Sequence, residues 1–149
     1  MQPAHKSDRD DHRANTIALL GQAYSLLGFK IVDGVVGAGY PQKPKHSAVF
    51  AQLGPEGARL SDLARGANMT PQAMGELVDE LEDLGYVRRE PDPSDRRAKR
   101  ITLTPLGVEC VTAAMTTIER IEARIDGILG TDGHAQLRAM LDRLLVEQD

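Results

Sequence analysis

The sequence predicts a mostly α-helical chain with one small β-hairpin and long helices at both ends. Apolar residues recur at steps of three and four through most of its 149 residues, which is the spacing of one helix face. Aromatic residues make up only 3% of the chain, so its core must depend on aliphatic side chains. After Gly85 the apolar period shortens to two, which is typical of a pair of strands.

The first helix is expected from about Asn15 to Val36, and a glycine-rich stretch ends it. Its apolar side chains lie on one face and comprise Ile17, Leu20, Tyr24, Leu27, Ile31 and Val35. A short helix is expected from about Lys45 to Leu53, before the turn at residues 54–57.

Two further helices are expected between residues 61 and 84. The shorter one covers residues 61–66. The longer one starts at Thr70-Pro71, where a capping hydroxyl precedes a proline whose missing N–H is not needed in the first turn. Its buried stripe comprises Met74, Leu77, Val78 and Leu81. Gly85 is the expected C-terminal cap.

A hairpin and two helices complete the chain. Residues 86–88 and 101–103 are predicted strands, and residues 91–99 are expected to form a long polar tip rather than a strand. Thr104 repeats the cap-and-proline start, and the helix that follows it continues to about Ile128. A last helix is expected over residues 131–146.

Composition excludes several classes of protein. No stretch approaches the roughly 18 uncharged apolar residues of a membrane-spanning helix. The N-terminal residues interleave acids and bases and do not form a targeting signal, so we expect a cytoplasmic protein. A single cysteine, Cys110, excludes an internal disulfide framework. The histidines are too far apart in sequence for a metal site, and no catalytic motif is present, so we expect no metal, no cofactor and no enzyme activity. These histidines are His5, His12, His46 and His134.

The charges are unevenly placed. The chain has 18 Lys and Arg against 22 Asp and Glu, and the resulting net charge of −4 argues mildly against a nucleic-acid partner. The segment from Tyr86 to Arg100 nevertheless holds six bases and three acids, a local charge of +3, so the rest of the chain carries −7. A helix, a short helix, a tight turn, a capped helix and a basic hairpin form the order of a winged helix-turn-helix, which suits duplex DNA.

Both ends of the chain carry long apolar stripes that the central module is too small to cover, so we expect an obligate homodimer. Its interface is expected to include Ile17, Leu20, Ile128, Leu137, Leu141 and Leu144. Residues 1–41 then form a tail and a dimerisation helix, residues 42–104 a winged helix-turn-helix DNA-binding region, and residues 105–149 the C-terminal dimerisation helices. A monomeric bundle with the stripes packed on each other is the alternative.

The hairpin also resembles a known family. Residues 92–107 look like the wing of the MarR family of bacterial transcription regulators. The D-x-R pattern of that wing falls on Asp95 and Arg97, and the L-T-x-x-G pattern that closes it lies within residues 103–107. The resemblance is specific over about residues 60–107, whereas the flanking helices match in their apolar pattern alone.

The resemblance implies a homodimer whose two winged modules straddle a palindromic DNA duplex. Arg97 would enter the minor groove, and Asp95 would hold its guanidinium in place. The residues nearest the bases would be Thr70, Gln72 and Ala73. Phosphates would be held by Lys45, His46, Arg96 and Lys99. Acids later on the recognition helix are expected to face solvent beyond the DNA, namely Glu76, Asp79, Glu80, Glu82 and Asp83.

A small-molecule effector is also implied by the resemblance. Many members of the family bind small aromatic or phenolic anions between the winged module and the dimer helices. Such a cleft would here be lined by Tyr24, Phe29, His46 and Phe50. The chain is therefore predicted to be a repressor that a ligand releases.

Three alternatives stay open. One is a dimeric protein-interaction scaffold whose acidic helix docks a basic protein. Another is a redox-responsive regulator that uses Cys110, although a buried apolar role is expected for this thiol. A third is a regulator without a ligand, controlled only by its own abundance.

Overall fold

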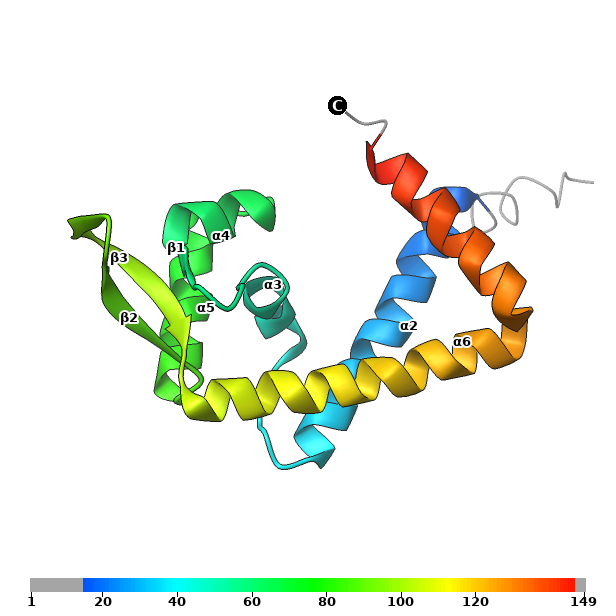
Figure 1. Cartoon of the computed structure of the whole chain (residues 1–149), viewed down its shortest axis with the longest axis horizontal. Helices are drawn as coiled ribbons and strands as arrows, with labels where there is room; N and C mark the ends of the chain where they lie inside the picture. Colours follow the sequence, from blue (N-terminus) through cyan, green and yellow to red (C-terminus); the bar gives the residue numbers. More distant parts are fainter. Residues whose placement is uncertain (1–14, 147–149) are drawn as a thin grey trace, which may run out of the picture.

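The structure is a computed structural model that describes residues 15–146. Its elements, in chain order, are α2 (Thr16–Gly37), η1 (Pro44–His46), α3 (Ser47–Phe50), β1 (Ala58–Arg59), α4 (Leu60–Gly66), α5 (Pro71–Asp83), β2 (Val87–Asp92), β3 (Asp95–Leu103) and α6 (Pro105–Val146). Figure 1 shows a module of short helices and a small sheet at one end, from which α6 runs past α2 to the opposite end. The predicted fold class, mostly helical with a small wing, is confirmed.

The sheet is larger than the sequence indicated. It has three antiparallel strands in the order β1-β3-β2, and β1 pairs Ala58 with Ile101. The residues predicted as a polar tip are mostly strand, since β2 and β3 pair Glu90 with Arg100 and Pro91 with Lys99. That prediction was wrong because the far half of this ribbon stands clear of the rest of the molecule (Figure 1), so neither of its faces needs apolar residues. We call β2, β3 and their connecting turn the wing.

The core lies where α4, α5 and the sheet meet. Leu63 of α4 and Met74, Val78 and Leu81 of α5 are fully buried, as their helical spacing predicted. The predicted helix cap is also present, because the Thr70 hydroxyl accepts a hydrogen bond from the backbone N–H of Ala73 at 3.2 Å. The buried side chains hold one face of α5 in the core, and the cap fixes where the helix begins. The residues of its first turn remain exposed to solvent.

The start of α6 is pressed against the sheet. A Cβ placed on Gly107 would lie 1.9 Å from the backbone oxygen of Tyr86, so only glycine fits at this position.

Further along, α6 is kinked at Gly130, whose φ of 72° is not helical. This kink separates the two C-terminal helices that the sequence predicted. The imidazole of His134 spans it and contacts Asp126 at 2.7 Å.

The predicted helix from Lys45 to Leu53 is shorter than expected. Only Pro44–His46 and Ser47–Phe50 are helical, as a 3₁₀ turn followed by one α-helical turn. The chain then turns toward β1. Val49 is fully buried and Phe50 packs on Tyr86 with ring centroids 6.2 Å apart, so this segment is still anchored to the core.

Helix α2 leaves most of its apolar face uncovered. Ile17 and Tyr24 are 79% and 76% exposed, and only Val32 and Val35 are buried. By length and hydropathy α2 is even apolar enough to cross a membrane, with a mean hydropathy of 1.3 over its best window. The expectation that no stretch approaches a spanning helix was therefore too strong, although Lys30 and Asp33 interrupt this one.

Candidate nucleic-acid interface

Helix α5 offers its first turn to solvent. Thr70 and Gln72 are exposed and Ala73 is half-buried, whereas the opposite face of the helix forms the core. Exposed side chains in the first turn of the second helix are the ones that contact bases in helix-turn-helix proteins. The structure thus brings together the three residues predicted to lie nearest the bases.

The acids later on α5 are held by neighbouring bases. Glu80 accepts from Lys43 at 3.2 Å and pairs also with Lys45 and His46. The Lys45 ammonium, followed by the His46 imidazole, lowers the pKa of the Glu80 carboxyl to about 2. The expectation that Glu80 simply faces solvent was wrong, because residues 43–46 lie directly against it.

Asp79 and Glu82 form a second pairing with Arg89 of β2. The guanidinium contacts Asp79 at 2.7 Å and also Glu82. These two acids are therefore partly neutralised, and so is one of the bases counted in the hairpin. Three of the five later acids of α5, namely Asp79, Glu80 and Glu82, are thus paired within the same chain, which weighs against the protein-scaffold alternative.

His46 does not take either of its predicted roles. It is 1% exposed, and its Nδ1 accepts the backbone N–H of Lys43 at 3.1 Å. Its Nε2 then carries the proton and donates to Glu80 at 3.0 Å. Because both nitrogens are used and the ring is buried, His46 reaches neither a phosphate nor the ligand cavities. It joins η1 to the recognition helix.

The wing is anchored by a carboxylate that the sequence analysis did not single out. Asp92 is 2% exposed, and its Oδ2 accepts from Arg59 Nε at 2.7 Å. Its Oδ1 accepts from the backbone N–H of Ser94 at 2.8 Å and from the Ser94 hydroxyl at 2.7 Å. The Ser94 bonds, with the Arg59 guanidinium, hold the pKa of Asp92 well below its usual range. The Asp-Pro-Ser run at the turn was a signal of this arrangement.

Asp95 binds the backbone of the wing turn and not the guanidinium of Arg97. Its Oδ1 accepts the backbone N–H of Arg97 at 3.0 Å. Over the described residues no ion pair joins its carboxylate to the Arg97 guanidinium, so the predicted contact is corrected to a backbone bond. A turn built this way fixes where the Arg97 side chain leaves the wing.

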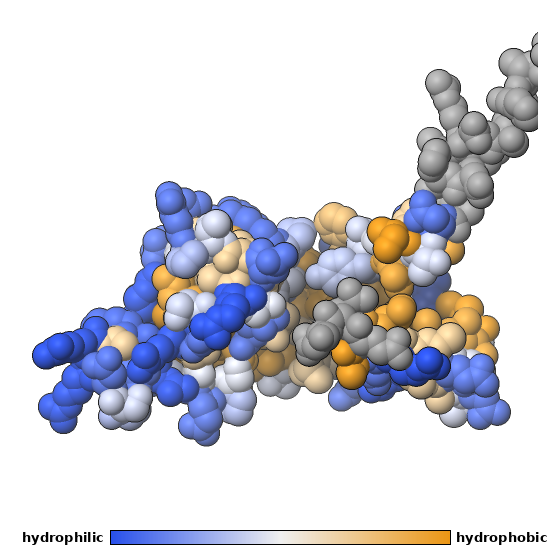
Figure 2. Space-filling view, turned by 90° about the horizontal axis from the view of Figure 1, so that it is seen from above, coloured by the Kyte–Doolittle hydropathy of each residue, from blue (hydrophilic) through white to orange (hydrophobic). Residues whose placement is uncertain are grey.

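Three wing cations are left without an acidic or backbone partner in the described part of the chain. These cations, which we call the free wing cations, are Arg96, Arg97 and Lys99, and all three are exposed. By contrast, Arg88 pairs with Glu90, and Arg100 donates to the backbone oxygen of Gly57 at 2.9 Å. Figure 2 shows strongly hydrophilic residues gathered at the wing end and apolar ones toward the opposite end.

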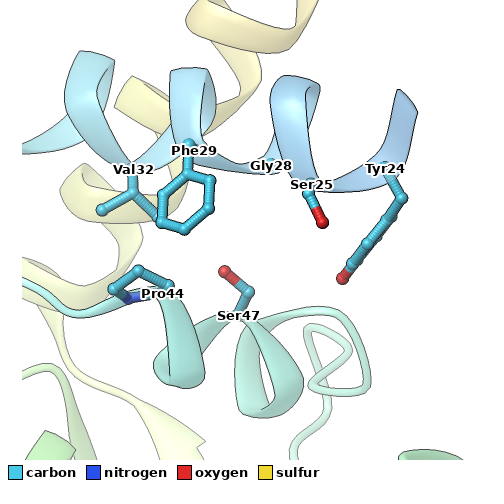
Figure 3. Close-up of a pocket in the computed structure, with 7 residues that line it drawn as sticks. All are labelled: Tyr24, Ser25, Gly28, Phe29, Val32, Pro44 and Ser47. Carbon is cyan, nitrogen blue, oxygen red and sulfur yellow. The ribbon is translucent and has the colours of Figure 1, made fainter. Parts of the chain in front are cut away.

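Two adjoining cavities lie between α2 and the central module. The smaller one, of about 210 Å³, separates α2 from η1 and α3, and Tyr24 and Phe29 face Pro44 and Ser47 across it (Figure 3). The larger one, of about 440 Å³, reaches on to α6 and includes Tyr24 and Phe50. Three of the four predicted cleft residues therefore line these cavities, and His46 does not.

Cys110 lies in the wall of the larger cavity. The residue is 1% exposed, and burial raises the pKa of its thiol to about 11. A thiol that stays protonated at neutral pH is a poor nucleophile. This environment supports the buried apolar role of Cys110 and weighs against the redox alternative.

Comparison with known proteins agrees with a winged helix-turn-helix carrying a basic wing. Residues 43–98 match the MarR family. The HTH-type transcriptional repressor Rv2887 of Mycobacterium tuberculosis is 31% identical over 116 residues, which cover 68% of this chain and 84% of the relative. The chain therefore belongs to the MarR family, a family of transcription regulators and not of enzymes.

Solved structures share the fold over nearly the whole chain. The transcriptional repressor CouR, bound to a 23-mer DNA duplex, superposes with a TM-score of 0.73 at 22% identity, covering 97% of this chain and 99% of that one. The Rv2887 protein of Mycobacterium tuberculosis, in complex with p-aminosalicylic acid, superposes with a TM-score of 0.64 at 26% identity, covering 88% and 98%.

Proposed function

We propose that this protein is a cytoplasmic repressor that binds a palindromic DNA duplex as a homodimer. The observation that carries the proposal is that the three free wing cations and the first turn of α5 are both exposed. Cations on a wing suit phosphates and a narrow minor groove, while Gln72 suits the edge of an adenine. Both kinds of contact belong to the same region, residues 42–104.

The dimer is supported by the uncovered apolar faces at the ends of the chain. Ile17 and Leu20 of α2 are 79% and 40% exposed, and Ile128 and Leu144 of α6 are 70% and 49% exposed. Leu137 and Leu141 are half-buried beside them. A monomeric bundle would have covered these side chains, so their exposure favours a second copy as the partner.

Release by a small ligand is supported by the position of the two cavities. They separate α2, which belongs to the dimer part, from η1 and α3, which contact the recognition helix through His46 and Glu80. A ligand in this place touches both parts. It would therefore change DNA affinity if it binds more tightly to one arrangement of the two parts than to the other.

Selection of bound duplexes from a random pool, followed by footprinting, tests the DNA-binding proposal. We expect the selected sites to be palindromes. Gln72→Ala should relax the preference at one base pair in each half-site by about 1–3 kcal/mol, because a bidentate base contact is lost. Gln136→Ala, an exposed change on α6, is the matched control. Failure to enrich any sequence would contradict the proposal.

The oligomeric state is tested separately by sedimentation of the full chain. The wild type should run as a dimer. Leu20→Glu should weaken association, because it places a charge on the uncovered face of α2. A wild type that stays monomeric at micromolar concentration would contradict the homodimer.

A further inference from the structure

The outer end of the wing has little support from the rest of the fold. Strand β1 ends at Arg59, opposite Arg100, so beyond this point the sheet consists of β2 and β3 alone. Pro91 has no backbone N–H to offer to this ribbon, and the pairing shifts register between Pro91 and Asp92. A two-stranded ribbon by itself is only marginally stable in water. The turn that carries the free wing cations therefore needs a further contact to hold its position.

Arg59 provides the link between the wing end and the helix-turn-helix. Over residues 15–146, it is the only residue outside the wing whose side chain hydrogen-bonds to residues 92–99. Its Nε donates to Asp92 Oδ2 at 2.7 Å, and its Nη2 lies 3.5 Å from the Ser94 hydroxyl. Arg59 also immediately precedes Leu60, the first residue of α4, and is the N-terminal cap residue of that helix. The guanidinium therefore joins the start of the helix-turn-helix to the wing turn.

The other oxygen of Asp92 extends this link into the turn. Its Oδ1 accepts from the backbone N–H of Ser94 at 2.8 Å, and the next residue, Asp95, accepts the backbone N–H of Arg97 at 3.0 Å. A series of short contacts thus runs from the start of α4 to a residue that carries a free wing cation. Contacts that hold a group in its bound geometry raise affinity, because less has to be ordered on binding.

We propose that the Arg59–Asp92 pair positions the free wing cations for specific DNA binding. Asp92 is then a positioning residue, although it is an acid within a surface that binds phosphates. The proposal rests on the DNA binding proposed above and identifies what holds the wing relative to the recognition helix. Specific binding needs both elements in place at once, whereas nonspecific binding needs only cations near phosphates.

Charge alone predicts the opposite effect of losing Asp92. The change Asp92→Asn removes an acid from each wing and frees the Arg59 guanidinium, so electrostatics by itself strengthens binding to any duplex. Positioning predicts weaker binding to the selected duplex. The side-chain Nδ2 of an asparagine cannot accept from Arg59, whereas its Oδ1 can still accept from Ser94. The change therefore breaks the link to α4 and spares the turn.

Fluorescence anisotropy with two labelled duplexes of equal length, the selected site and a random sequence, separates these effects. We expect Asp92→Asn to bind the selected site about tenfold more weakly than the wild type, because a charge-assisted hydrogen bond is lost in each protomer. Its affinity for the random duplex should stay the same or rise. Glu90→Gln is the matched control, because it makes the same charge change and frees Arg88 within β2 alone. This control should strengthen binding to both duplexes.

Weaker binding of Asp92→Asn to both duplexes, or tighter binding to both, would overturn the proposal. Urea unfolding checks that each variant is folded. Should Asp92→Asn fail to fold, the double change Arg59→Ala with Asp92→Asn keeps the net charge of the wild type and leaves no unpaired carboxylate. The double variant should lose affinity for the selected site and keep its affinity for the random duplex. An unchanged affinity for the selected site would contradict the proposal.

Failure of this proposal differs from failure of the proposed DNA binding. Amide hydrogen exchange of the free full-length protein reports how firmly the wing turn is held. Asp92→Asn should exchange faster over residues 94–99 and at an unchanged rate over α5, and equal exchange in wild type and variant would overturn the link. If exchange is faster but affinity for the selected site is not reduced, the pair orders the wing without positioning it for DNA, and the proposal is wrong. If the wild type selects no duplex, DNA binding fails, and the exchange rates still decide whether the pair orders the wing.

Discussion

The change Arg97→Ala gives the sharpest test of how the wing contacts DNA. The wing region carries six bases, but the structure leaves only Arg96, Arg97 and Lys99 without an acidic or backbone partner in the described chain. A dimer therefore presents six such cations. Each one that binds a phosphate releases a counterion from the duplex, so the number of contacts sets the salt dependence of affinity.

The expected magnitude follows from that number. If all six free cations of a dimer engage phosphates, a plot of log affinity against log salt has a slope of about −5.4, and affinity falls by roughly 10³ between 50 and 200 mM salt. Arg97→Ala removes one cation from each protomer. The slope should then fall to about −3.6, and the loss over the same range to roughly 10².

Fluorescence anisotropy with a labelled duplex measures this slope. Arg88→Ala is the matched control, because it removes a wing arginine that is paired with Glu90. Its slope should stay near that of the wild type. Arg124→Ala, an exposed change within α6 and outside the wing, controls for net charge. An unchanged slope in Arg97→Ala, or an equal reduction in Arg88→Ala, would refute the reasoning.

Other predictions concern the fold and its titrating groups. Gly107→Ala should destabilise the protein by about 1–3 kcal/mol in urea, because its Cβ meets Tyr86, whereas Gly127→Ala should stabilise α6 by about 0.5–1 kcal/mol. Equal effects would contradict the close approach at residue 107. Glu80 has a folded pKa of about 2 against an ordinary value of 4.5, so its contribution is present above pH 4.5 and is lost as pH falls toward 2. The stability difference between wild type and Glu80→Gln should shrink over that interval, and a constant difference would contradict the pairing. Cys110 should react with thiol reagents only after unfolding, so fast reaction in the native state would contradict its burial.

Features that depend on neighbours in sequence could be predicted. The buried stripe of α5 follows from a helical repeat of apolar residues, and the Thr70 cap follows from a hydroxyl placed before Pro71. The break between the two C-terminal helices was expected between Ile128 and residue 131, where the apolar repeat ends, and the non-helical Gly130 lies there. Each of these is decided within a few residues, where backbone geometry leaves little choice.

Features that depend on distant partners could not be predicted. Arg59 meets Asp92 across 33 residues of sequence, and His46 meets Glu80 across 34. No spacing rule connects such pairs, because the tertiary fold alone brings them together. For the same reason β1 was missed, since a two-residue strand exists only through its pairing with β3. These contacts also decide which of the charged residues remain free for DNA.

The ion pairs within the protein will not obscure the salt test. Those of Lys43, Arg59 and Arg89 join atoms 2.7–3.2 Å apart, whereas the Debye length is about 8–10 Å at 0.10–0.15 M salt. Screening changes little at so short a separation, so the recognition helix and the wing should keep their positions over the titration. Counterion release, in contrast, depends on log salt throughout the range. If the plot of log affinity against log salt is straight, its slope therefore gives the number of phosphates contacted. A curved plot would show that the ion pairs within the protein loosen as salt rises.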